Sequence, residues 1–194
     1  MGKLSTRFQE LSNLIPIIEL QAAGAISAAA DAIVGAFENN RKVLICGNGG
    51  SAADSQHFAA EFVNAFSRDL ERKALPALAL STDTSILTSI ANDFEFENIF
   101  SRQVEAHGQP GDILIALSTS GVSKNCVSAI KIARALGLRT ITLTRKDAQI
   151  SLLSEISIEV PSQNTQHIQE CHILAYHVIT ELVEDTLFRK ALNP

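Results

Sequence analysis

The chain has few cysteines, and their arrangement excludes a disulfide framework. Cys46, Cys126 and Cys171 are odd in number, stand far apart and lie in apolar segments. Small secreted domains that depend on disulfides carry paired cysteines at close spacing. The sequence therefore predicts reduced thiols in the core of a cytoplasmic protein. Tryptophan is absent altogether, and aromatic residues are sparse.

An excess of positive charge is also missing. The formal net charge is −5 and the isoelectric point is near 5.5. Proteins that bind the phosphate backbone of nucleic acids present a basic surface, so we expect no nucleic-acid partner. This balance still permits local binding of a single sugar phosphate.

No uninterrupted apolar stretch approaches the roughly 20 residues that span a bilayer. The first residues, Met1 to Ser5, soon give way to polar and acidic ones and do not follow the charged-then-apolar order of an export signal. We therefore expect no membrane partner and a cytoplasmic location.

What the chain does have is material for one large core. It has 194 residues, of which 46% are hydrophobic and 19% charged, which predicts a single domain over residues 1–194. Five short runs have strand character, and several are apolar throughout: residues 42–46, 75–80, 112–117, 139–143 and 156–160. Helical patterns alternate with them at residues 52–66, 84–91, 98–106, 124–136 and 148–153. The alternation predicts an α/β fold with a doubly wound, five-stranded parallel sheet.

Helical patterns also occupy both ends of the chain. Over residues 5–39 the apolar positions recur at helical spacing, Pro16 predicts a break or a kink, and we interpret the pattern as two helices. A long last helix is predicted over residues 165–188, with an apolar stripe wider than a surface helix needs. We expect this helix to pack against another subunit and the N-terminal helical segment to contribute to oligomerisation.

Two loops that follow predicted strands have the composition of a phosphate cradle. The first is Gly47-Asn48-Gly49-Gly50-Ser51, and the second is Ser118-Thr119-Ser120-Gly121-Val122-Ser123. Backbone N–H groups at the start of the next helix can stabilise an anion there. The first loop also fits a dinucleotide fingerprint, but the acidic residue expected about 20 residues later is missing. A P-loop is excluded because no Gly-Lys-[Ser/Thr] follows, and a tight turn that binds nothing is the remaining interpretation of the first loop.

Polar residues on two predicted helices are candidates for chemistry. His57 and Glu61 are four residues apart and share a helix face, either as a solvated pair or as ligands for zinc and an acid/base group. Gln169 and His177 stand eight residues apart, so they differ in direction by about 80° and are about 12 Å apart along the axis. To bind one ion, either the helix opens near Gln169 or a second subunit supplies one ligand. His172 and His177, taken alone, are more typical of core or interface histidines.

Asn92 and Asp93 end a predicted helix, and their planar side chains suit sugar hydroxyls equally well.

Taken together, these segments resemble the sugar isomerase (SIS) domain family over essentially the whole chain. The motifs that carry the resemblance are Cys46 to Asp54, Gln56 to Glu61, Ile90 to Phe94, Phe100 to Val104, Ser118 to Gly121, and Ile168 to Glu170 with His177. Within the family they look like the enzymes that isomerise a phosphorylated heptose. The resemblance implies conversion of D-sedoheptulose 7-phosphate to D-glycero-D-manno-heptose 7-phosphate, a step toward the heptose of lipopolysaccharide core.

The same resemblance implies roles for individual residues. It implies one Zn²⁺ per subunit, with the ligands His57, Glu61, Gln169 and His177, and it implies Glu61 and His177 as the acid/base groups. The implied substrate-binding positions are Asn48, Gly49, Gly50, Ser51, Glu61, Asn92, Asp93, Ser118, Thr119, Ser120, Ser123 and Gln169. It also implies a homotetramer whose active sites form between subunits.

The sequence departs from the family pattern at two loops. Val122 stands where the hydroxyl loop usually has asparagine, and Arg145 to Gln149 replace a glycine-rich segment that we expect to lie off the site. Two other functions are compatible with the fold: a non-catalytic relative that binds the replication initiator, and a regulatory module that senses a sugar phosphate. The relatives that bind the replication initiator lack the carboxylate and the histidine that this chain has at Glu61 and His177. A regulatory module that only senses a sugar phosphate does not need the pair His57 and Glu61.

Overall fold

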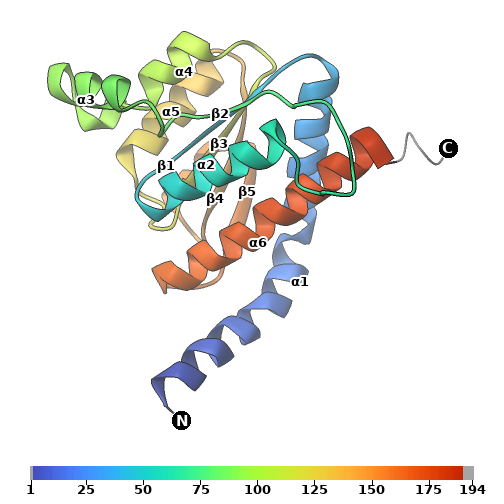
Figure 1. The fold of residues 1–194 in the computed structure, drawn as a ribbon. Helices are drawn as coiled ribbons and strands as arrows, with labels where there is room; N and C mark the ends of the chain where they lie inside the picture. The colour runs from blue at the N-terminus through green and yellow to red at the C-terminus, as the bar shows by residue number, and fades with distance from the viewer. Residues whose placement is uncertain (1, 190–194) are drawn as a thin grey trace.

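The computed structural model describes residues 2–189, which form a five-stranded parallel sheet with helices on both faces (Figure 1). The strands are β1 (Val43–Gly47), β2 (Ala77–Ala79), β3 (Ile113–Ser118), β4 (Arg139–Arg145) and β5 (Ile156–Val160). Their order across the sheet is β2-β1-β3-β4-β5. The chain thus adds β2 on one side of β1 and then crosses to the other side of β1 to add β3, β4 and β5, which confirms the predicted doubly wound sheet. Ligands bind at such a switch point in open α/β sheets.

The burial of β1 and β3 explains their uniform composition. Every residue of both strands is buried, so neither strand has a polar side to alternate with an apolar one. They pair in register from Val43 opposite Ile113 to Gly47 opposite Leu117. The two glycine- and serine-rich loops therefore leave the sheet side by side.

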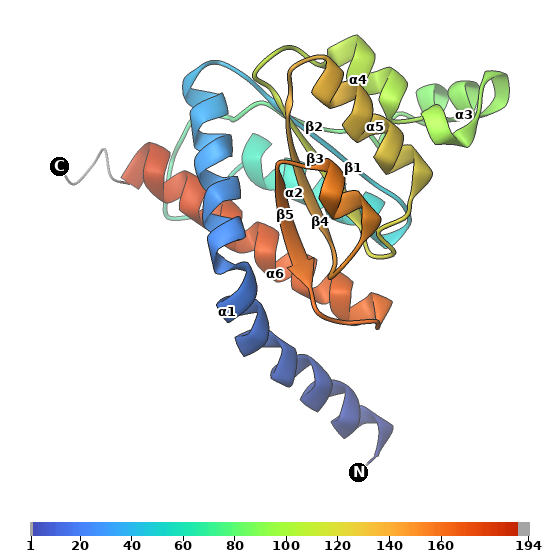
Figure 2. The same cartoon turned by 180° about the vertical axis from the view of Figure 1, so that it is seen from behind.

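Two hydrophobic clusters cover the two faces of the sheet. One joins the sheet to α1 (Lys3–Glu38), α2 (Gly50–Val63) and α6 (Thr165–Glu184). The other joins it to α3 (Thr84–Asp93), α4 (Ser101–His107) and α5 (Lys124–Ala135). Figures 1 and 2 show these groups of helices on opposite sides. Because α2 and α6 share one face, polar residues on them can meet.

Several predicted helices differ from the structure in extent. The prediction of two helices over residues 5–39 is wrong. The structure has one helix there, α1, which contains Pro16 and changes direction along its length (Figure 2). The pattern at 98–106 divides into a 3₁₀ turn (Phe96–Asn98) and α4, and that at 148–153 is a 3₁₀ turn (Gln149–Leu153). The last helix ends at Glu184 and continues as a π-helical turn (Asp185–Arg189).

By length and composition alone, α1 could cross a membrane. In the structure α1 contacts α6 and β5, and 44% of its most apolar 18-residue segment is buried. A core helix of a soluble protein passes the same test. The absence of a membrane partner therefore stays a prediction.

The cysteines behave as predicted. Cys46, Cys126 and Cys171 are free and buried, and burial raises the pKa of the Cys171 thiol to about 11. A thiol with so high a pKa is protonated at neutral pH and acts as a small apolar core residue.

Candidate active site

The loop after β1 brings the main chain close to α6. Gly49 has φ of +56°, a conformation that favours glycine, and α2 begins at the next residue. A Cβ atom added to Gly50 would lie 2.6 Å from the amide of Gln169. Ser51 is buried in the first turn of α2, where its carbonyl oxygen accepts a hydrogen bond from Ser55. A side chain at position 50 would therefore have to displace the end of the Gln169 side chain, which is a predicted site residue.

The loop after β3 gathers hydroxyl groups at the start of α5. The Oγ atoms of Ser118 and Ser123 are 3.0 Å apart, and those of Ser118 and Ser120 are 3.5 Å apart. Ser118 Oγ also accepts a hydrogen bond from the N–H of Gly121, 3.1 Å away. Ser123 is the N-cap of α5, and Thr119 is half-buried beside these serines in the chain. Hydroxyl groups and the free N–H groups of a helix start are groups that can bind an anion.

The two loops are linked by a pair of amides. Asn48 Nδ2 donates to Asn125 Oδ1 at 2.9 Å, and Asn125 Nδ2 donates back to Asn48 Oδ1 at 2.8 Å. A cavity of about 360 Å³ lies beside this pair and is lined by Asn48, Glu95 and Ser123, among others. Asn125 was not predicted as a site residue, because its partner is 77 residues away in the chain.

A second cluster lies between α2 and α6. One donor atom from each of His57, Glu61 and His177 lies within 4.8 Å of the other two. His57 Nε2 is 2.8 Å from Glu61 Oε1, and the rings of His57 and His177 are 5.1 Å apart. The His57 and Glu61 side chains are 47% and 19% exposed, so the cluster is open to a ligand. A group of two histidines and one carboxylate matches the ligands that catalytic zinc prefers.

Tyr176 orients His57 and was missed in the sequence. Its hydroxyl is 2.9 Å from His57 Nδ1, on the side of the ring away from Glu61. Burial, followed by the carboxylates of Asp54 and Glu61, raises the pKa of the Tyr176 hydroxyl, which keeps it neutral. A partner on the second ring nitrogen fixes the tautomer of a metal-binding histidine. Tyr176 is the only tyrosine of the chain and precedes His177, which is the signal that could have identified it.

Burial also changes the protonation of His177. It lowers the pKa of the imidazole, His57 lowers it further, and Glu61 opposes the change. His177 is therefore largely neutral at pH 7 and can accept a proton or bind a metal.

Gln169 lies close to this cluster on the same helix. Its Nε2 donates to Asp54 Oδ2 at 2.9 Å, and Asp54 precedes His57 by one turn of α2. Burial raises the pKa of Asp54, and the bond from Gln169 opposes the rise. The proposed opening of the helix near Gln169 is wrong, because α6 is continuous from Thr165 with Asn164 as its N-cap.

Other candidates lie apart from these groups. Asn92 and Asp93 are exposed at the end of α3, where Asn92 Nδ2 donates to Asp93 Oδ1 at 2.8 Å. Within residues 2–189 no hydrogen bond joins them to the hydroxyl loop or to His57 and Glu61. His172 is fully buried, and burial lowers its pKa to about 4. It is a neutral core residue.

The segment that begins at Arg145 was predicted to lie off the site, and this is wrong. Arg145 Nε donates to the main-chain oxygen of Ser120 at 3.0 Å. Ala148 packs against the same loop, since a Cβ added to Gly121 would clash with the Cβ of Ala148. Both contacts arise because Ser118 pairs with Thr144 in the sheet, so the two strands end together.

Comparison with known proteins agrees with this arrangement. The SIS domain family model matches residues 8–145. The phosphoheptose isomerase of Citrifermentans bemidjiense is 53% identical over 86% of each chain, and that of Aromatoleum aromaticum is 48% identical over 94% of this chain and 93% of its own. The chain belongs to the SIS domain family. It groups there with the phosphoheptose isomerases.

A solved structure of this family agrees in detail. The phosphoheptose isomerase GmhA from Neisseria gonorrhoeae is 37% identical and covers 94% of this chain and 97% of its own, with a TM-score of 0.89. Such similarity over nearly the whole of both chains confirms the α/β sugar isomerase fold.

Proposed function

We propose that this protein isomerises D-sedoheptulose 7-phosphate to D-glycero-D-manno-heptose 7-phosphate in the heptose pathway that supplies lipopolysaccharide core. The observation that carries the proposal is the meeting of His57, Glu61 and His177 between α2 and α6, in a fold that also has two glycine- and serine-rich loops at its switch point. The names of relatives that are about half identical over most of the chain support the same reaction.

The reaction moves two protons between neighbouring atoms. A proton leaves C1 of the ketose and returns to C2, while another passes from the hydroxyl on C1 to the oxygen on C2. We assign the carbon proton to Glu61 and the oxygen proton to His177. The lowered pKa of His177 suits it to this exchange, because a neutral imidazole both accepts and donates near neutral pH. Carbon, hydrogen and oxygen balance without an oxidant.

The loops hold the rest of the substrate. Ser118, Thr119, Ser120 and Ser123 offer hydroxyl groups to the phosphate at the start of α5. We assign further contacts with the sugar to Asn48, Gly49, Gly50, Ser51 and Gln169, and its hydroxyl groups to Asn92 and Asp93. Phosphate binding at one end and proton transfer at the other fix the sugar in one orientation.

The donor set fits zinc. His57, Glu61 and His177 would hold one Zn²⁺ per subunit. Because α6 is continuous, Gln169 and His177 of one helix do not reach the same ion, so the fourth ligand would be the partner subunit's Gln169. The ion would polarise the sugar carbonyl and stabilise the negative charge that develops on oxygen. His57 is kept in position by Tyr176, whether or not an ion is bound.

Assembly as a homotetramer accounts for the exposed apolar surface. A cavity of about 360 Å³ runs between α1 and α6, and it is lined chiefly by Ile15, Ile18, Ala23, Ile26, Leu174 and Val178. Leu20, close by on α1, is 85% exposed. Monomers rarely expose such large apolar groups together.

The deciding assay incubates the unmodified protein with sedoheptulose 7-phosphate and Zn²⁺ and measures heptose 7-phosphate. Product formation supports the enzyme, and its complete absence would favour the binding protein for the replication initiator. Elemental analysis of the same sample, compared with His57→Ala, tests the zinc site. Light scattering gives the subunit number.

A further inference from the structure

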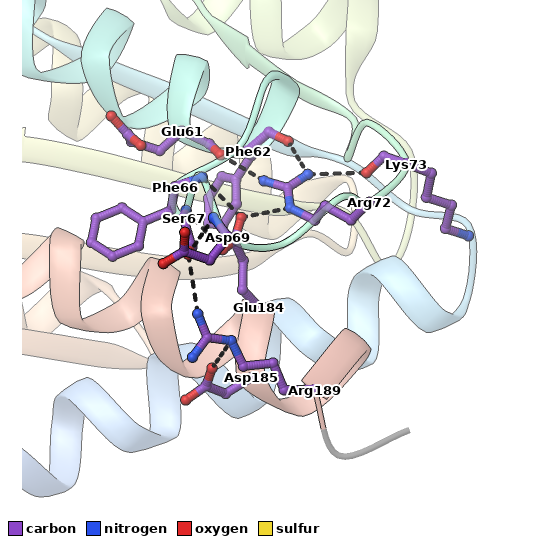
Figure 3. Close-up of polar contacts among 10 residues, drawn as sticks. All are labelled: Glu61, Phe62, Phe66, Ser67, Asp69, Arg72, Lys73, Glu184, Asp185 and Arg189. Carbon is purple, nitrogen blue, oxygen red and sulfur yellow. Dashed lines mark hydrogen bonds and ion pairs between the residues drawn. The ribbon is translucent and has the colours of Figure 1, made fainter. Parts of the chain in front are cut away.

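An irregular segment between α2 and β2 contains a buried charge. Figure 3 shows Arg72 of this segment facing Glu184 near the end of α6. Their Nε and Oε1 atoms are 2.5 Å apart, and the two side chains are 0% and 2% exposed. A buried ion pair is a costly element, because removal of both charges from water offsets much of their attraction. Its contacts therefore deserve a functional explanation.

Arg72 binds the end of the helix that carries Glu61. Its Nη2 donates to the main-chain oxygen of Glu61 at 2.7 Å, and its Nη1 donates to that of Phe62 at 2.9 Å (Figure 3). Because α2 ends at Val63, these two carbonyl groups have no helical N–H partner, although that of Phe62 also accepts from the main-chain N–H of Leu75 at 3.1 Å. The guanidinium supplies that partner and adds a positive charge at the negative end of the helix. The main chain of Glu61 is thereby held in place directly.

Glu184 attaches the same arginine to the helix that carries His177. Its carboxylate accepts hydrogen bonds from the N–H groups of Phe66 at 2.9 Å and Ser67 at 3.2 Å (Figure 3). The Phe66 ring lies 5.6 Å from that of His177. Glu184 and His177 are seven residues apart on α6, so they lie on nearly the same face, about 10 Å apart along the axis.

These contacts form a bridge from Glu61 through Arg72 and Glu184 to α6. We propose that Arg72 and Glu184 are positioning residues that fix the separation of Glu61 and His177. This inference rests on the proposed isomerase function. It explains why a buried pair of charges is used: an apolar pair of the same volume would fill the space but could not bind the carbonyl oxygens of Glu61 and Phe62.

The test compares Arg72→Lys and Glu184→Gln with a matched control, Asp112→Asn. Asp112 is 1% exposed and, like Glu184, accepts bonds from two main-chain N–H groups and one cation: Lys42 N–H, Gln109 N–H and Lys42 Nζ. It lies where β3 begins, and its side-chain partners, Lys42 and Gln109, belong to neither α2 nor α6. Lysine at position 72 keeps the charge but has no fork to span both carbonyl groups.

We expect kcat to fall at least tenfold in both variants, with KM for sedoheptulose 7-phosphate within twofold of the unmodified value. Asp112→Asn, at a comparable loss of urea stability, should keep kcat within twofold. The proposal is overturned if the folded Arg72 and Glu184 variants keep their kcat, or if kcat follows urea stability across all three.

A second measurement does not require isomerase activity. Titration calorimetry with ZnCl₂ should show at least tenfold weaker binding in Arg72→Lys than in Asp112→Asn, because Glu61 and His177 would be less well positioned. If the unmodified protein lacks isomerase activity, the proposed function fails and this comparison still decides the positioning role. Equal Zn²⁺ binding in the two variants, or none in the unmodified protein, would overturn it.

Discussion

At the amino end of the sheet, Asp112 is surrounded by partners from its own chain and is almost fully buried. Glu61, between α2 and α6, is paired with His57 but stays 19% exposed, and His57 itself is 47% exposed. Both carboxylates have partners, yet only Glu61 has room for a further one. Saturated polar groups stabilise a fold, whereas groups that keep unused hydrogen-bonding capacity can bind a substrate. The comparison assigns stability to Asp112 and chemistry to Glu61.

The largest effect is expected from Glu61→Gln. The amide keeps the size of the side chain but cannot accept the carbon proton, so kcat should fall by about 10²-fold or more. Sedoheptulose 7-phosphate should still bind, and calorimetric binding measures this separately from turnover. Near-normal turnover would remove Glu61 from the acid/base role.

The corresponding change at the other carboxylate, Asp112→Asn, should affect stability alone. It weakens charge-assisted bonds to Lys42 and to two main-chain N–H groups, so the free energy of unfolding should fall by about 1.5–3 kcal/mol. Urea titration followed by circular dichroism gives the change. A large loss of kcat in the folded variant would contradict the division between the two carboxylates.

The sequence allowed the sheet to be predicted because its central strands are short, apolar and separated by helical patterns. A strand that is buried on both faces needs apolar residues throughout its length, and β1 and β3 are such strands. The break at Pro16 was wrong for a reason outside the local sequence. Leu14 and Ile18 on either side of it are both buried in the same cluster, and this packing holds the helix together despite the missing hydrogen bond.

The site was predictable only in part. His57 and Glu61 follow from helical spacing, whereas the roles of Gln169 and His177 came from family resemblance. Arg145 could not be identified, because its contact with the hydroxyl loop depends on β4 lying next to β3. A strand order is a property of the whole fold, and no local pattern encodes it.

A moderate effect is expected from the hydroxyl loop. The double change Ser120→Ala with Ser123→Ala removes two hydroxyl groups that we assign to the phosphate, each worth about 1.5–3 kcal/mol. KM should therefore rise at least tenfold, while the urea midpoint stays close to that of the unmodified protein. An unchanged KM would mean that the phosphate binds elsewhere.

The smallest effect is expected from Arg145, which shares features with both Asp112 and Glu61. Like Asp112 it has a partner within the protein, since its Nε donates to the Ser120 carbonyl. Like Glu61 it is only half-buried, and it adds positive charge beside the proposed phosphate site. A half-exposed charge contributes about 0.5–1 kcal/mol, so Arg145→Ala should raise KM about two- to fivefold and leave kcat unchanged.

Lys146→Ala is the matched control, because it removes the same charge from the next residue, whose exposed side chain has no hydrogen bond within the described part of the chain. If Arg145 acts through charge, its effect should shrink in high salt, where surface electrostatics are screened; if it acts by holding the Ser120 carbonyl, the effect should persist. Equal changes in KM for both variants would show that the Ser120 contact has no part in substrate binding.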